Sequence, residues 1–261
     1  MGLKPFESPS ILLEAAKESL RELRVMSQEF LDNCGYDEVK RRDNKTRETV
    51  ISLRFHSKVS PRLLTTASHT VNDLRHALDH AVCAGACFLG PCDLRGVYFP
   101  SARTSVELDS AIRGLSKKID HELATFLRKF NSYSEGDELL YALNTLAKEN
   151  KHRHILRISL NSFGMTIGAS GRPWRLSPAP GTQLGINKWN DLRNELEFHR
   201  FAEGTTGGID ARPALQMVFG DGKAPLNKPA IDVVEALIQK VEGVVKEIEG
   251  ETARIAHSKE M

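Results

Sequence analysis

The chain has 261 residues, of which 40% are hydrophobic and 27% are charged, and its formal net charge is +2. This is the composition of a globular protein, and a chain this long can bury a core without disulfides. A net charge so close to zero excludes the strongly basic surface typical of proteins that bind nucleic acid over a whole face. Any contact with nucleic acid would have to come from a local basic patch.

The cysteines and the apolar runs predict the compartment. Three of the four cysteines, Cys83, Cys87 and Cys92, crowd into one segment, which is a poor disulfide framework, so we expect free thiols in a reducing environment. The first ten residues lack the apolar core of a signal peptide, and no stretch approaches the roughly 18 apolar residues of a membrane span. We therefore expect a cytoplasmic protein without membrane contact.

Apolar residues at helical spacing predict five helices, at about 11–31, 60–89, 104–130, 137–153 and 229–250, with a frayed tail after the last. Alternating apolar residues predict strands at 51–55, 156–160, 165–167, 195–201 and 214–219, with a hairpin turn at 161–164. The charge run at 37–48 and the Gly- and Pro-rich stretch at 170–190 are interpreted as loops, the second anchored by Trp174 and Trp189. Glu195, Glu197 and His199 are expected on a solvated strand face.

The order of these elements predicts the fold class. Helices come first, antiparallel strands follow and a helix closes the chain, which favours α+β over a doubly wound sheet. We expect a helical bundle of about five helices with a small antiparallel sheet inserted before the C-terminal helix. A single domain would cover 1–261, with a helical part at about 11–154, a β insert at about 155–220 and a closing helix at about 229–250. The chain has no Gly-rich phosphate loop and no internal repeat.

The helix expected at 60–89 carries a polar face. At 100° per residue, Val71, Leu74, Leu78 and Val82 fall on one side, and the titratable residues His69, Asp73, His76 and His80 fall on the other. Asn72, Arg75 and Asp79 lie on the flank between them. A helix face dense in titratable groups is either a candidate site or a solvated face with an Arg75–Asp79 ion pair one turn apart.

The segment Arg75-His76-Ala77-Leu78-Asp79-His80 resembles the R-x4–6-H motif of HEPN ribonucleases, in which a polar residue follows the arginine. The resemblance implies a dimeric helical protein that cleaves RNA without a metal or other cofactor. Arg75 would hold the scissile phosphate, His80 would be the general acid or base, and His76 and Asp79 would orient them. A second match, residues 193–199, runs into an expected strand and is set aside.

A broader resemblance covers about residues 45–250. The pieces NDLRHALDHAV (72–82), VYFPSARTSVEL (97–108) and YSEGDELLYALNTLAKENKHRHIL (133–156) stand in the chain in this order. They resemble a bacterial and phage family of uncharacterised proteins that shares an L-R-x-A-L-D-H helix and an N/D-K-H-R helix end. This resemblance implies the order of the elements and a bacterial or phage origin, but not an activity.

A second cluster of basic residues lies at the C-terminal end of the helix expected at 137–153. Lys151, His152 and Arg153 are expected either to stabilise the helix C-terminus or to bind backbone phosphate. Asn144, two turns before Lys151, would join them, and Asn72 would add a polar contact from the other helix.

Three functions stay open. The first is a metal-independent endoribonuclease of a toxin or phage-defence kind, with RNA as partner and a homodimer as its active form. The second is a nonenzymatic partner-binding or antitoxin-like protein, whose polar helix face would specify a protein partner. The third is a metal-binding helical protein that uses the face formed by His69, Asp73, His76 and His80.

Overall fold

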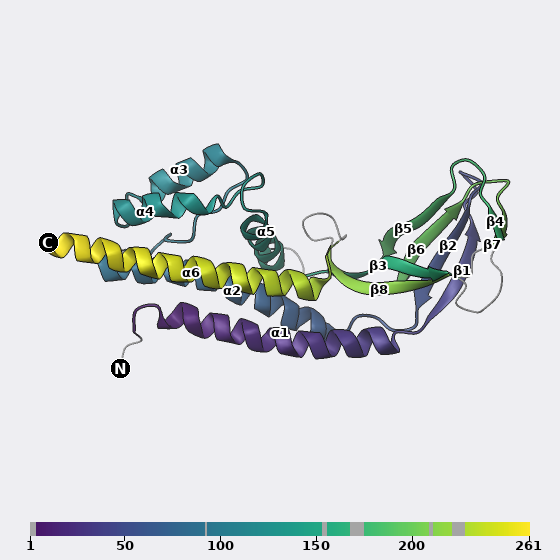
Figure 1. Cartoon of the computed structure of the whole chain (residues 1–261), viewed down its shortest axis with the longest axis horizontal. Helices are drawn as coiled ribbons and strands as arrows, with labels where there is room; N and C mark the ends of the chain where they lie inside the picture. The colour runs from purple at the N-terminus through teal and green to yellow at the C-terminus, as the bar shows by residue number, and fades with distance from the viewer. Residues whose placement is uncertain (1–3, 92, 153–155, 168–174, 209–210, 221–227) are drawn as a thin grey trace. The chain divides into compact units, whose positions relative to one another are not determined.

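The computed structural model describes residues 4–91, 93–152, 156–167, 175–208, 211–220 and 228–261, and it confirms the α+β class (Figure 1). The helices are α1 (Glu7–Asn33), α2 (Pro61–Leu89), α3 (Ser105–Leu115), α4 (His121–Leu127), the 3-10 helix η1 (Arg128–Phe130), α5 (Glu138–His152) and α6 (Ala230–Glu260). The strands are β1 (Tyr36–Arg42), β2 (Thr49–Phe55), β3 (Ile158–Ile167), β4 (Arg175–Ser177), β5 (Gln183–Asn190), β6 (Glu195–Phe201), β7 (Thr206–Gly208) and β8 (Ala211–Phe219).

The chain forms two compact units, each built from separate stretches of sequence. The first, the helical unit, consists of Met1–Arg24, Leu64–Leu156 and Ile231–Met261. The second, the β unit, consists of Val25–Leu63 and Arg157–Ala230.

In the helical unit, the long helices α1, α2 and α6 lie side by side (Figure 1). Their facing sides are apolar, with Leu74 and Leu78 of α2 and Val241 and Ile248 of α6 fully buried. Gly85 lies against α6, where an added Cβ would stand 2.8 Å from Thr252 Oγ1. A side chain at this position would push the two helices apart, so glycine permits the packing.

The helix expected at 104–130 is broken into α3, α4 and η1. The break has a local cause, because the Asp120 side chain accepts a hydrogen bond from the Leu123 backbone N–H (3.1 Å) and so starts a new helix. The closing helix α6 extends to Glu260, ten residues beyond the expected end, because Ile255 remains buried in the helical unit. No helix in the described part of the chain is long and apolar enough to cross a membrane.

In the β unit, the main sheet has four antiparallel strands in the order β1-β2-β6-β5. Two of these strands, β1 and β2, precede α2, so the prediction that the sheet is one insert before the last helix is wrong for half of it. Most of β1 lies in the charge run that was predicted as a loop. An edge strand can carry charged side chains because one of its sides faces water.

The stretches around β3 and β5 also differ from the sequence prediction. Residues 161–164 are not a hairpin turn, because β3 continues to Ile167 and pairs with β8, with a bulge between Ser162 and Gly164. The expected loop at 170–190 contains β4 and β5, with Trp189 inside β5. Trp174 lies outside the described residues. These pairings join segments far apart in sequence, which local patterns do not reveal.

The strand face of β6 that we expected in solvent is covered, because Glu195 and His199 are buried and Glu197 is half-buried. Glu195 and His199 are only 1% and 4% exposed. Burial alone would raise the pKa of Glu195, but hydrogen bonds from Arg54 and Arg41 bring this pKa below its ordinary value. His199 Nδ1 accepts a hydrogen bond from the Gly185 backbone N–H (3.2 Å), and burial lowers the pKa of its imidazole.

Candidate functional site

The helix α2 presents its polar residues as the spacing predicts. Val71, Leu74, Leu78 and Val82 are buried, whereas His76 and His80 are exposed. The flank residues Asn72, Arg75 and Asp79 are half-buried. The candidate residues therefore belong to two environments, an open face and a partly covered flank.

The half-buried flank holds the segment that follows α2. Arg75 Nη2 donates to the Phe99 carbonyl (2.8 Å) and lies 3.0 Å from Asp79 Oδ1. Asp79 Oδ1 in turn accepts from the Phe99 backbone N–H (2.8 Å). Both backbone polar groups of Phe99 are thus bound by one ion pair, which we call the Phe99 clamp. These hydrogen bonds explain why a charged pair can occupy this half-buried position of α2.

Burial shifts both partners of the Phe99 clamp toward their neutral forms. It raises the pKa of Asp79, against the effects of Arg75, the Phe99 N–H and the two nearby histidines, His76 and His80. It also lowers the pKa of Arg75, against the effect of Asp79. The four residues that the HEPN-like motif selects are therefore electrostatically linked through Asp79. Such perturbed groups gather at functional sites, although structural ion pairs produce them too.

His80 is held by a residue that the sequence analysis missed. Its Nδ1 and the Ser8 Oγ are 2.6 Å apart, and its ring stacks on that of His76 with 6.5 Å between centroids. Ser8 lies in the first turn of α1, two residues after Phe6, a buried residue with a positive φ of 63°. Nothing in the local sequence around Ser8 could reveal a partner 72 residues away. Because Nδ1 faces Ser8, Nε2 is the ring nitrogen left to exchange a proton with another molecule.

The two ends of the motif are not joined by a hydrogen bond or ion pair in the described chain. Arg75 is bonded to Phe99, whereas His80 is bonded to Ser8. Five residues along a helix separate two side chains by about 140°, so one straight helix points them in different directions. A single phosphate could meet both only if a second molecule supplied one of them.

A hollow of about 430 Å³ opens beside Arg75. Its lining includes Arg75, Lys118, Phe99 and the ring of Tyr98, which is 60% exposed. Lys118 Nζ donates to the Arg95 carbonyl (3.0 Å) and also lines a second hollow of about 530 Å³ with Asp93, Arg95 and Lys117. Cations next to an exposed aromatic ring are the arrangement that binds a phosphate together with an unstacked base.

No family model, curated protein or solved structure matches this chain. The chemistry of the site therefore rests on its own residues.

The structure describes only some of the proposed substrate-binding residues. Asn72 is half-buried on α2, and Asn144 is half-buried on α5. In the described chain no hydrogen bond links Asn144 to Arg75 or His80. The side chains of Lys151 and His152, and the whole of Arg153, lie outside the described residues, so their predicted role stays a prediction.

The metal alternative has no preformed site in the part of the chain that the structure describes. Among the described residues, no three His, Cys, Asp or Glu side chains are placed so that they could hold a metal ion. Cys34 and Cys83 are free thiols, and burial raises the pKa of both. A raised thiol pKa disfavours the thiolate form that metals bind.

Proposed function

We propose that the protein is a metal-independent endoribonuclease with HEPN-like chemistry, active as a homodimer. The observation that carries the proposal is the hollow beside Arg75, where Lys118 and the exposed Tyr98 ring accompany an arginine whose ion-pair partner, Asp79, also interacts with the exposed His80. A role in toxin or phage defence and the helical bundle of that family belong to the same proposal.

The reaction needs one base and one acid. Neutral His80 would take the proton of a ribose 2′-hydroxyl through Nε2, and the 2′-oxygen would attack the adjacent phosphorus. The bond from phosphorus to the 5′-oxygen would break, and that oxygen would take a proton from the imidazolium that His80 has become. The products would be a 2′,3′-cyclic phosphate and a 5′-hydroxyl. Ser8 would fix the orientation of the imidazole by accepting the hydrogen bond from Nδ1.

Arg75 would stabilise the charge that develops on the phosphate. A guanidinium has five N–H donors, and Nη2 carries both contacts of the Phe99 clamp. Asp79 would keep the arginine at the edge of the hollow, and preorganised donors of this kind stabilise transition-state charge without rearranging. Tyr98 would stack on an adjacent base.

Cleavage of a labelled unstructured RNA in the presence of EDTA tests this proposal. His80→Ala should reduce cleavage by about 10² to 10⁴, the usual contribution of a general acid or base. His69→Ala is the matched control, because His69 is exposed on the same helix and has no place in the mechanism. Single-stranded DNA should resist cleavage because it lacks the 2′-hydroxyl. Equal cleavage by the His80 and His69 variants, each shown to be folded, would end the proposal.

A mixing experiment tests whether the site is shared between two chains. Arg75→Lys and His80→Ala should each be inactive alone. Mixed in equal amounts, they should recover about one quarter of the original activity, because half the dimers are mixed and one of their two sites is intact. No recovery on mixing would show that Arg75 and His80 act from the same chain.

One observation favours the second candidate, a nonenzymatic partner-binding protein. Phe88, Leu94 and Tyr98 are large apolar or aromatic residues, close in sequence, and all are exposed. Exposed apolar groups of this size are common at protein interfaces. This candidate predicts a stable complex and no cleavage of any RNA, so the cleavage assay separates the two.

A further inference from the structure

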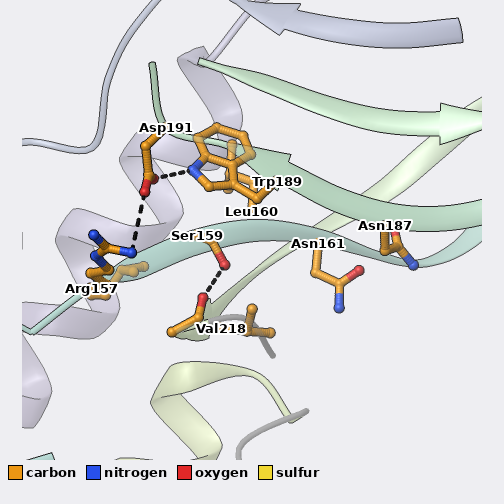
Figure 2. Close-up of a pocket in the computed structure, with 10 residues that line it drawn as sticks. Arg157, Ser159, Leu160, Asn161, Asn187, Trp189, Asp191 and Val218 are labelled. Carbon is orange, nitrogen blue, oxygen red and sulfur yellow. Dashed lines mark hydrogen bonds and ion pairs between the residues drawn. The ribbon is translucent and has the colours of Figure 1, made fainter. Parts of the chain in front are cut away.

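The β unit contains a polar hollow of about 250 Å³ between β3 and β5 (Figure 2). Its lining comes from β3, β5, the turn after β5 and the end of β8. The side chains that give it chemistry are Arg157, Ser159, Asn161, Asn187, Trp189 and Asp191. It shares no residue with the hollow beside Arg75, so a ligand bound here would be independent of the proposed ribonuclease activity.

Strand alternation creates the polar wall of this hollow. Arg157, Ser159 and Asn161 occupy alternate positions of the β3 segment. Ile158 and Leu160 between them are buried and add apolar atoms to the lining. Ser159 is occupied elsewhere, because its Oγ donates to the Gly220 carbonyl (2.6 Å). Arg157 and Asn161 are therefore the two residues of this stripe that are placed to meet a ligand.

An asparagine side chain closes one end of the hollow. Asn187, in the left-handed region with a φ of 57°, accepts from the Ser162 backbone N–H (2.9 Å) and donates to the Ser162 carbonyl (2.8 Å). The side-chain amide thus makes the two hydrogen bonds that the backbone of a neighbouring strand would make, and it links β5 to β3 at this point. Beside it, Asn161 Oδ1 is buried and has no hydrogen-bond partner in the described chain. A buried acceptor without a partner favours a ligand that brings an N–H or O–H donor.

The other end of the hollow is charged but balanced. Asp191 Oδ1 accepts from the indole N–H of Trp189 (2.6 Å), and Asp191 Oδ2 lies 3.7 Å from Arg157 Nη1. This ion pair is too long for a hydrogen bond, so both groups keep capacity for other partners. Figure 2 shows Trp189 between this pair and the two asparagines. The hollow therefore offers a lone acceptor at one end, a flat aromatic side chain in the middle, and a donor with an acceptor at the other end.

The size of the hollow limits the ligand. Pockets for drug-sized ligands measure about 300–1,000 Å³, so 250 Å³ has room for one small molecule and excludes a polymer. The five residues from Arg157 to Asn161 span about 13 Å of strand, four steps of about 3.3 Å each, so the ligand has to be elongated to reach both ends. The opposite charges of Asp191 and Arg157 offset each other at this end of the hollow, which favours a molecule without a net charge.

We propose that this hollow binds a nucleoside. An N–H of the base would donate to Asn161 Oδ1, the flat base would lie against Trp189, and the ribose hydroxyls would meet Asp191 and Arg157. A nucleoside carries these groups in this order: donor, flat ring, vicinal hydroxyls. A single sugar ring carries hydroxyls on all sides and has no flat aromatic face, and a nucleotide would add a phosphate charge where Asp191 already balances the charge of Arg157.

The test uses the fluorescence of Trp189 in a Trp174→Phe background, which leaves Trp189 as the sole indole of the chain. Adenosine, guanosine, cytidine and uridine are titrated separately into the full-length protein, with glucose and adenosine 5′-monophosphate as comparison ligands. At least one nucleoside should give a saturable change, more tightly than its monophosphate, and glucose should give none. No saturable change with any nucleoside, or equal binding of glucose, would overturn the proposal.

Two variants locate the ligand, and each is first shown to be folded by circular dichroism. Asn161→Leu should weaken nucleoside binding about tenfold, the effect of one lost hydrogen bond in a buried site. Lys188→Ala is its matched control, because Lys188 is exposed and alternates with Asn187 and Trp189 on β5. Asp191→Ala, measured by calorimetry, should weaken the nucleoside but not the free base. Unchanged affinity in Asn161→Leu, or equal losses for nucleoside and free base in Asp191→Ala, would overturn the assignment.

Discussion

The Phe99 clamp should behave as a coupled structural pair. The side chains of Arg75 and Asp79 are only 15% and 16% exposed, so water screens them little. Asp79→Leu removes the acceptor of the Phe99 N–H and leaves the guanidinium without its counter-charge. We expect it to lower the free energy of unfolding by about 4 kcal/mol, within the range for breaking a buried pair. Arg75→Met keeps most of the side-chain volume, removes the other charge and should lower it by about 3 kcal/mol.

The double variant decides whether the two residues act together. Independent effects would add to about 7 kcal/mol, whereas a coupled pair should lose only about 4 kcal/mol, because neither charge is left alone. Urea unfolding of the four proteins at pH 7 measures the difference. His76→Ala is the control, since an exposed residue on the same helix should change stability by less than about 0.5 kcal/mol. Additive losses, within about 0.5 kcal/mol, would refute the clamp.

Three further predictions concern packing and pH. Gly85→Ala should lower the free energy of unfolding by about 1–3 kcal/mol, because its Cβ would crowd Thr252. Gly243→Ala, in open space within α6, should raise this free energy by about 0.5–1 kcal/mol. Equal effects of the two variants in urea unfolding would contradict the packing. Because burial lowers the pKa of His199, the free energy of unfolding should fall as the pH drops below the unfolded pKa of 6.5. In a pH series of unfolding curves, His199→Asn should flatten this decline. An unchanged slope in the variant would contradict the role of His199. Glu195→Gln should lower the free energy of unfolding by about 2 kcal/mol at pH 7. This loss should shrink as the pH falls below 4.5, because the pKa of Glu195 in the folded protein lies lower than that. A loss that does not depend on pH would contradict the stabilisation of Glu195 by its arginine partners.

Local patterns predicted the helices well. The apolar stripe of α2 and its limits at Pro61 and Leu89 agree with the structure. Both are predictable because the buried positions of a helix and the residues that start it lie close together in the sequence. The break at Asp120 was missed even though aspartate is a strong helix N-cap, because the apolar stripe continues across it.

The strands and the site depend on distant partners, and there the sequence was less informative. β1 is rich in charge and gives no alternating apolar signal, and its pairing with β2 is what makes it a strand. The Arg75–Asp79 pair was visible as a four-residue spacing, but its binding of Phe99 was not. Ser8 became a candidate only once folding had brought α1 alongside α2.

The polypeptide passes from one unit into the other four times, after residues 24, 63, 156 and 230. No single cut can therefore release either unit intact, and neither can be expressed alone as one uninterrupted fragment. During synthesis, the β unit has to wait for residues 157–230 and the helical unit for α6, so neither can complete its core before these segments have been made. A nonsense mutation anywhere before β8 would thus leave both halves of the molecule unfinished.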